Sequence, residues 1–440
     1  KGVDFSSVVA VSGSGQQHGS VYLRSCFGEK LSQLDSGQSL AEQIEGCLTR
    51  KSSPIWMDSS TSAECAEIAS AVGGNEVVCA KSGSIAVERF TGSQIRKFFK
   101  TEPEAYVETG VIHLVSSYFA SILAGRNVAI DRGDGAGMNL MNLASGEWDD
   151  DLVDATADGL KEKLPPVAPS NTNSGPISSY FVQKYGFSKN CQTVIWSGDN
   201  PCSLIGMGAA KPGKVVISLG TSDTLFAAMP EPKTDPNGYG HVFGNPVGGF
   251  MSLICFKNGS LAREAIKDQF NLEWSAFEKS GLAQTPIGND GILMLPFYEP
   301  EITPRIDTGG PVFSTDNALT PEQSVRAVLE CQFLNMRNNF GWLGVDPTRI
   351  SLTGGASAND GIAQVVANVF GVPVDRLDAP GSATIGAAMR AGHAIGIDLD
   401  VLEGNFSQAK KGSTIEPEEG AFEIYQQMIP QFAQFISSQH

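Results

Sequence analysis

The chain has 440 residues, a formal net charge of −17 and 41% apolar residues. This length predicts two domains, and the apolar fraction is typical of a globular protein and excludes a disordered chain. The acidic excess argues against binding to a phosphate backbone, so we expect no nucleic-acid partner.

The eight cysteines and the apolar runs indicate the cellular compartment in which the protein is expected. The cysteine spacing contains no Cys-x-x-Cys pair, which argues against a zinc or thioredoxin-type site. No uninterrupted apolar stretch approaches the ~20 residues of a membrane span, and the first residues lack the basic-then-apolar pattern of a signal peptide. We therefore expect a cytoplasmic protein without a membrane partner.

The first half of the chain alternates apolar runs with turns that contain glycine. Val8–Val11 is predicted to be a buried strand that leads into the polar turn Gly15–Gly19. Residues 27–53 are polar without a clear period and are expected to lie at the surface. Residues 105–124 are predicted to form one amphipathic helix that contains a structural His113 and ends at Gly125.

A second strand with its turn precedes the expected domain boundary. Residues 193–196 are predicted to form this buried strand, and Gly198–Pro201 follows it directly. In that turn we expect Asn200 to cap a helix that has Pro201 as its first residue. The boundary itself is expected near Lys211–Gly213.

The second half repeats the pattern of strand, glycine turn and helix. Val215–Leu219 is a predicted strand that ends in Gly220–Asp223, and a strand over residues 350–352 ends in Thr353–Ser357. Thr320–Gln323 has the pattern of a capping box at a helix start. Residues 381–392 are rich in small side chains and predict a closely packed helix. Because strands alternate with helices throughout, the fold class is α/β.

The turns after these strands are candidates for chemistry. Turns at 220 and 354–355 place backbone N–H groups where they suit phosphate, although each is also compatible with an ordinary connection. Neither matches GxxxxGK[ST] or GxGxxG, so a P-loop or Rossmann site has little support. Asp199 follows a buried strand, where its carboxylate could accept a proton from a substrate hydroxyl or cap the next helix. Together the two turns and this acid predict a nucleotide site.

Two further groups suit a polyol ligand. The turn Gly15–Gly19 contains His18 beside two glutamines, and these side chains supply both donors and acceptors. Arg89 could contact the same ligand or form an ordinary surface ion pair.

The sequence contains seven short segments that together carry a resemblance: Gly15–Gly19, Trp56–Thr61, Glu88–Gly92, Asp134–Asn139, Gly198–Asn200, Ile217–Asp223 and Thr353–Ser357. Taken in order, they resemble the FGGY family of carbohydrate kinases over nearly the whole chain. Each segment is a weak signal by itself, whereas the seven in sequence are specific. The segment Cys255–Ser260 is similar to the sequences of the subgroup of the family that phosphorylates D-xylulose.

The resemblance implies a two-domain fold of the actin, sugar-kinase and heat-shock-protein ATPase type, which is ribonuclease H-like, with the active site in the interdomain cleft. It implies a sugar-binding domain over residues 1–210 and a nucleotide-binding domain over residues 211–440. The implied activity is ATP-dependent phosphorylation of D-xylulose to D-xylulose 5-phosphate, with Mg²⁺ as the expected metal ion.

The resemblance also assigns roles to individual residues. Asp199 would be the general base, and the ketopentose would be held by His18, Arg89, Asp199 and Asn200. ATP would lie near Gly220, Thr221, Ser222, Trp274, Gly354, Gly355, Ala356 and Asn359. No metal ligand is assigned.

One segment of the family precedes the region that matches here. The family begins with a strand hairpin that carries an Asp-x-(Ser/Gly)-Thr phosphate loop, so we expect the N-terminal domain to be incomplete at its start. Two alternatives stay open. The first is another kinase of the family, acting on ribulose, glycerol or gluconate, and the second is a non-catalytic protein that binds sugar or nucleotide without that loop.

Overall fold

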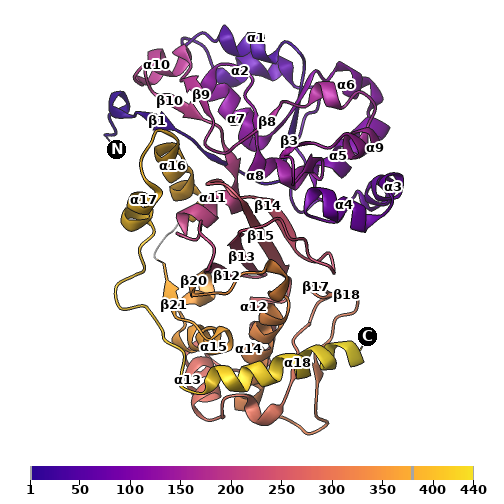
Figure 1. The fold of residues 1–440 in the computed structure, drawn as a ribbon, viewed down its shortest axis with the longest axis vertical. Helices are drawn as coiled ribbons and strands as arrows, with labels where there is room; N and C mark the ends of the chain where they lie inside the picture. The colour runs from indigo at the N-terminus through magenta and orange to yellow at the C-terminus, as the bar shows by residue number, and fades with distance from the viewer. Residues whose placement is uncertain (1, 378–380, 440) are drawn as a thin grey trace.

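The structure is a computed structural model that describes residues 2–377 and 381–439. In Figure 1 the elements from β1 to α11 form the upper group, and most elements from β12 onward form the lower group. Helices α16 (Ser382–Ala394) and α17 (Leu399–Phe406) return to lie beside the upper group. The molecule is thus a mixed α/β protein of two domains, as predicted.

The described residues of the N-terminal half form short strands and helices around three apolar clusters. Its strands are β1 (Ala10–Val11), β2 (Ser14–Gly15), β3 (Ser20–Leu23), β4 (Val111–Leu114), β5 (Ile130–Asp131), β6 (Met141–Asn142), β7 (Glu147–Trp148), β8 (Val167–Ala168), β9 (Asn173–Pro176), β10 (Gln192–Val194) and β11 (Ser197–Gly198). Its α-helices are α1 (Phe27–Ser32), α2 (Leu40–Ile44), α3 (Ser62–Val72), α4 (Asn75–Ser82), α5 (Thr91–Thr101), α6 (Pro103–Glu108), α7 (Val115–Ala124), α8 (Arg132–Gly135), α9 (Asp150–Thr156), α10 (Ser179–Tyr185) and α11 (Asp199–Gly206).

A six-stranded sheet in the order β14-β15-β13-β12-β20-β21 organises the C-terminal half. The sheet strands are β12 (Lys214–Leu219), β13 (Asp223–Met229), β14 (His241–Gly244), β15 (Phe250–Phe256), β20 (Arg349–Thr353) and β21 (Val374–Arg376), and the short strands are β16 (Met294–Leu295), β17 (Glu301–Ile302), β18 (Arg305–Ile306) and β19 (Val312–Phe313). The other helices are α12 (Ser260–Gln269), α13 (Trp274–Ala283), α14 (Pro321–Asn338), α15 (Asp360–Phe370) and α18 (Ala421–Ser438). These helices pack with the sheet into the largest apolar cluster of the chain.

Several local predictions for the C-terminal half are confirmed. The strands β12 and β20 lie where the apolar runs predict them, and the small-residue segment forms α16. Thr320 and Gln323 make the predicted capping box at the start of α14. These signals are local, because a cap or a short buried strand depends on neighbouring residues in the sequence.

The prediction of one helix over residues 105–124 is wrong. The segment forms α6, then the strand β4, then α7. Strand β4 pairs antiparallel with β3, with Ser20 opposite Leu114, and this pairing outweighs the helical period of the apolar residues. His113 is buried in β4 within hydrogen-bond distance of Ser117 and Asn127, as a structural histidine should be.

The prediction that residues 27–53 form a surface excursion holds only in part. The segment contains α1 and α2, and it buries its own apolar side chains against the neighbouring strand and helix. The residues of this cluster are Leu23, Phe27, Leu31, Ile44, Cys47 and Ile122.

No helix within residues 2–377 and 381–439 is both long and apolar enough to cross a lipid bilayer. The cytoplasmic location stays a prediction.

Candidate active site

The turns at 220 and 354 lie at one edge of the six-stranded sheet. Strands β12 and β20 run parallel, with Ser218 opposite Thr353, so their C-terminal ends lie side by side. Gly354 has a φ of 91°, and a Cβ there would lie 2.2 Å from the carbonyl oxygen of Leu219. Only glycine therefore allows the second turn to approach the first this closely. This edge is where α/β sheets commonly bind ligands.

A cavity of about 540 Å³ opens beside the two turns. It is lined by six of the residues predicted to bind ATP: Gly220, Thr221, Trp274, Gly355, Ala356 and Asn359. Ser222 and Gly354 belong to the same two turns but lie outside the lining. Trp274 is 42% exposed, and the Nζ of Lys267 lies 5.8 Å from its ring centroid. Asn359 accepts a hydrogen bond from the backbone N–H of Ile362 at 2.9 Å, so it also caps α15.

A buried ion pair supports the turn at 220. Arg263 of α12 is fully buried and donates from its two terminal nitrogens to the two carboxylate oxygens of Asp223, each at 3.0 Å. Asp223 Oδ1 also accepts a hydrogen bond from the backbone N–H of Gly220 at 3.1 Å. The sequence did not indicate Arg263, nor Ser260 and Glu264, which line the same cavity. All three lie in α12, and only packing decides which face of this helix meets the sheet.

His18 lies in the turn after β2 and its ring is buried. Its Nδ1 is 2.8 Å from the carbonyl oxygen of Gly137, and since a carbonyl only accepts, Nδ1 carries the proton and Nε2 is the acceptor. Burial, reinforced by the charge of Arg89, lowers the pKa of His18 to about 3. The neutral ring can therefore accept a hydrogen bond from a sugar hydroxyl.

Arg89 contacts a residue of the other half of the chain. Its Nη2 lies 3.0 Å from Nε2 of His241 on β14, and its guanidinium carbon lies 5.5 Å from the ring centroid of Phe90. The ring of Phe90 stacks on His18 with a centroid distance of 4.2 Å. These contacts place Arg89 beside His18 and differ from the surface ion pair that the sequence also allowed.

Asp199 and Asn200 are the first two residues of α11. The N-cap is Gly198 and Pro201 is the third helical residue, so the expectation of an Asn200 cap followed by proline at the first position is wrong. Asn200 instead donates to Oε1 of Gln17 at 2.7 Å, and its backbone N–H donates to Asp199 Oδ1 at 2.9 Å. The parallel pairing of β2 with β11 brings these segments together.

The carboxyl group of Asp199 is half-buried. Burial raises its pKa, while the backbone N–H groups of Asn200 and Gln17 oppose the shift. Gln17 is the neighbour of His18 in the same turn, so the four predicted sugar residues, which include the base candidate, belong to one connected set of contacts. A carboxylate of raised pKa that is partly open to solvent is suited to take up a proton.

Two further carboxyl groups lie behind Asp199. Asp131 accepts hydrogen bonds from Ser170 and Ser197, and Asp134 accepts one from Ser116. Burial raises the pKa of Asp134 well above its usual range, and the charges of Asp131 and Asp199 act in the same direction. Sequence reasoning placed Asp134 in a motif but assigned no role to it, because its burial and the raised pKa that results appear only in the folded chain.

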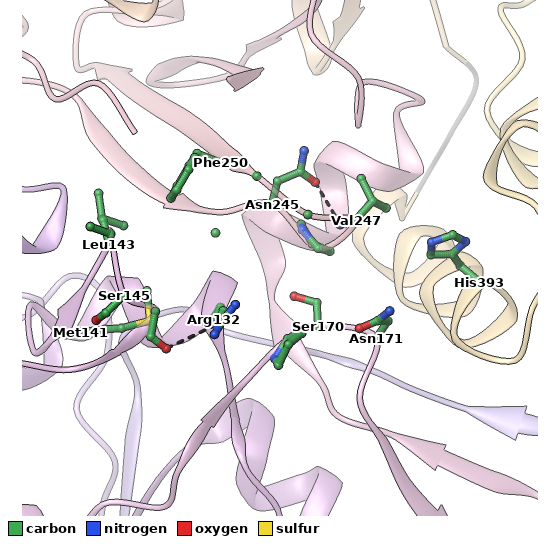
Figure 2. A pocket seen from close by; sticks show the side chains of 17 residues that line it. Arg132, Met141, Leu143, Ser145, Ser170, Asn171, Asn245, Val247, Phe250 and His393 are labelled. Atoms are coloured by element: carbon green, nitrogen blue, oxygen red, sulfur yellow. Dashed lines mark hydrogen bonds between the residues drawn. The ribbon is translucent and has the colours of Figure 1, made fainter. Parts of the chain in front are cut away.

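A second cavity of about 260 Å³ lies between the two halves, with Arg132, Ser170 and Asn171 on one side and Asn245, Phe250 and His393 on the other (Figure 2). It contains none of the predicted site residues. The loop after β14 lines this cavity, which shows that the strand and its loop lie against the N-terminal half.

Two family models match the chain. Residues 49–206 match the N-terminal domain, and residues 215–395 the C-terminal domain, of the FGGY family of carbohydrate kinases. A xylulose kinase of Rattus norvegicus is 44% identical over 98% of this chain and 82% of its own length. Xylulose kinase 2 of Arabidopsis thaliana is 46% identical over 89% of this chain and 73% of its own length.

Solved structures agree with this fold. The xylulose kinase of Rhodospirillum rubrum superimposes with a TM-score of 0.82 at 20% identity, covering 98% of this chain and 84% of its own. The glycerol kinase of Plasmodium falciparum, solved with ADP, has a TM-score of 0.78 at 15% identity, covering 98% and 83%. The fold is therefore that of the two-domain sugar kinases. The chain belongs to the FGGY family of carbohydrate kinases, and it is a phosphotransferase with ATP as the donor.

Proposed function

We propose that this protein catalyses the ATP-dependent phosphorylation of D-xylulose to D-xylulose 5-phosphate. The observation that carries the proposal is the half-buried Asp199 at a strand end, hydrogen-bonded to Asn200 and linked through Gln17 to the turn of His18. The identity of 44% and 46% to relatives named xylulose kinases supports the choice of sugar.

In the proposed reaction Asp199 accepts the proton of the sugar's 5-hydroxyl as that oxygen attacks the γ-phosphorus of ATP. The bond between the γ-phosphorus and the oxygen that bridges it to the β-phosphate breaks, and ADP leaves. His18, Arg89 and Asn200 hold the other oxygens of the ketopentose and orient the attacking hydroxyl. Phosphoryl transfer depends chiefly on such positioning and on stabilising the charge of the phosphates. The guanidinium of Arg89 and the neutral ring of His18 supply complementary donor and acceptor groups for this purpose.

The proposed ATP site is the cavity beside the sheet edge. Gly220, Thr221 and Ser222 would face the phosphates, and Trp274 with Gly355 and Ala356 would contact the adenosine, with Gly354 and Asn359 shaping the second turn. The proposed domains are residues 1–210 for sugar and 211–440 for nucleotide, a division supported by the gap between the two family-model matches.

Magnesium is the proposed metal ion. Within residues 2–377 and 381–439 there is no group of three side chains that would form a metal cage. A half-buried carboxylate such as that of Asp199 fits Mg²⁺, which in kinases is bound by one or two carboxylates together with phosphates and water. Asp199 would be the carboxylate near it, and the bound ion would neutralise charge on the phosphates.

A panel of acceptors tests the proposal. ADP release should be measured with D-xylulose, D-ribulose, glycerol and D-gluconate, each with MgATP. We expect kcat/KM to be highest for D-xylulose. A higher value for another acceptor would assign that substrate instead, and sugar binding without ADP release would indicate the non-catalytic alternative.

A further inference from the structure

His241 lies on the edge strand of the sheet that carries the ATP cavity, yet its side chain contacts the N-terminal half. Its Nε2 is 3.0 Å from Arg89 Nη2, and its Nδ1 is 3.1 Å from the hydroxyl of Ser84. The backbone N–H of Val242 donates to the carbonyl of Gly83 at 2.9 Å. Strand β14 is therefore attached to the segment 83–89 at three points.

The partners of His241 determine its tautomer. A guanidinium can only donate, so Nε2 must accept the hydrogen bond from Arg89 and the ring proton must lie on Nδ1. That proton is donated to Ser84. Only the neutral ring satisfies both contacts, and burial together with the charge of Arg89 lowers the pKa of His241 well below its usual value.

The ring of His241 is also held by packing. It is 6% exposed, and its centroid lies 5.2 Å from that of Phe90 and 6.1 Å from that of Phe243. Phe90 in turn stacks on His18. The imidazole therefore has little freedom to move, and the Arg89 nitrogen bonded to it is restrained with it.

We propose that His241 is a positioning residue for sugar binding, which directs the guanidinium of Arg89 so that the sugar site is completed by a strand of the nucleotide-binding half. This inference rests on the proposed function, because it takes Arg89 as a sugar-binding residue. The other sugar residues, His18, Asp199 and Asn200, come from the N-terminal half alone.

The sheet connects this position to the turn at 220. His241 pairs with Leu253 of β15, and β15 pairs with β13, whose first residue is Asp223. Asp223 accepts a hydrogen bond from the backbone N–H of Gly220. The strand that restrains Arg89 is thus part of the same sheet as the proposed phosphate turn.

Calorimetric titration of the full chain with D-xylulose, without nucleotide, tests the inference. We expect His241→Leu to raise the Kd for D-xylulose about 10-fold, comparable to a lost charge-assisted hydrogen bond. His241→Gln, whose amide oxygen can take the place of Nε2, should stay within about 3-fold of the wild type. KM for D-xylulose should rise in the leucine variant more than kcat falls.

A matched control is His113→Leu, which removes another buried histidine hydrogen-bonded to two side chains. This variant should lose stability without a change in the Kd for D-xylulose. If His241→Leu does not fold, Ser84→Ala provides the second measurement, since it removes only the partner of Nδ1 and should also raise the Kd.

A double-mutant cycle separates the inference from the proposed function. In an Arg89→Ala background, His241→Leu should cause no further rise in Kd, because the histidine acts through the arginine. If the rises in Kd of the two single variants add fully in the double variant, the inference alone is overturned. The same holds if Arg89→Ala raises the Kd while His241→Leu leaves it normal. A normal Kd in Arg89→Ala would overturn the sugar-site assignment and the inference with it.

Discussion

Asp199 combines two features that a general base needs. Its first-turn position on α11 leaves the carboxyl half-buried, and the N–H of Asn200 fixes one of its oxygens at 2.9 Å. Burial raises its pKa, which increases its affinity for the proton that the sugar hydroxyl must lose. Both features suit the proposed role of Asp199 as the general base.

Replacement Asp199→Asn should lower kcat by about 10²–10⁴-fold, since the amide keeps the shape but cannot accept the proton. Steady-state ADP release measures kcat, and calorimetry should show that D-xylulose still binds. Asp400→Asn is the control, because Asp400 is an exposed partner of Lys211 and is not among the residues of the proposed site. A kcat for Asp199→Asn near that of the wild type would exclude Asp199 as the base.

The pH profile of kcat should show an acidic limb that belongs to Asp199. The carboxylate is active only when ionised, and its pKa is raised above the ordinary value of 3.8, so kcat should fall as the pH falls toward that raised pKa. Initial rates between about pH 4.5 and 8, at saturating substrates, report this limb. A flat profile over this range would contradict the expected protonation.

At the scale of elements, the helix that begins with Asp199 packs closely against α16 of the other half. A Cβ on Gly386 would lie 1.8 Å from the carbonyl oxygen of Cys202, and one on Gly206 would lie 2.0 Å from that of Ser382. Arg390 of α16 is buried and donates to the carbonyl of Ser170 at 2.9 Å. Helix α16 therefore supports α11, the helix that carries Asp199.

Gly386→Ala should destabilise the protein by about 1–3 kcal/mol, because the added methyl group forces the two helices apart. It should also lower kcat, since α11 carries Asp199. Urea unfolding and ADP release measure the two effects. Gly404→Ala is the matched control: Gly404 lies in helix α17, and a Cβ there meets no atom of the described residues within 4 Å.

In that control the alanine should be neutral or stabilise the helix by about 0.5–1 kcal/mol. Equal free energies of unfolding for Gly386→Ala and Gly404→Ala would show that the close contact between α11 and α16 does not determine the stability of the protein.

At the scale of the whole molecule, buried histidines make stability depend on pH. Burial lowers the pKa of His18 to about 3 and that of His113 to about 4, below the usual 6.5 of the unfolded chain. Each neutral histidine thus contributes fully to the free energy of unfolding above pH 6.5. This contribution is lost as the pH falls from 6.5 toward the pKa of the histidine in the folded chain, because in that range only the unfolded chain takes up the proton.

Below about pH 6 the free energy of unfolding should fall by about 1.4 kcal/mol per pH unit for each such histidine. Urea unfolding at about pH 7, 6 and 5 should therefore give a shallower slope for His113→Gln than for the wild type, by about this amount per unit. The buried carboxyl groups are common to both proteins, so the difference isolates His113. Identical slopes would mean that His113 can be protonated in the folded state.

The sequence by itself determined the features that depend on neighbours along the chain. These include the strands β12 and β20 that end in glycine turns, the capping box of α14 and the seven segments that resemble the family. The predicted buried strand Val8–Val11 is instead a two-residue strand that is only partly buried. A turn or a cap is stabilised by contacts within a few residues, so its signal is local. For this reason the residue pattern alone was enough to select Asp199 and the turns at 220 and 354.

Only the tertiary structure decided which distant residues meet. Arg89 reaches His241 across 152 positions, and Arg263 reaches Asp223 across 40. Strand β4 forms because β3 lies beside it, although its own residues favour a helical period. Such contacts are stabilised by burial and by pairing between segments that are distant in the sequence. No local sequence pattern predicts them. The contact of Arg89 with His241, on which the proposed positioning role rests, could therefore be found only in the folded chain.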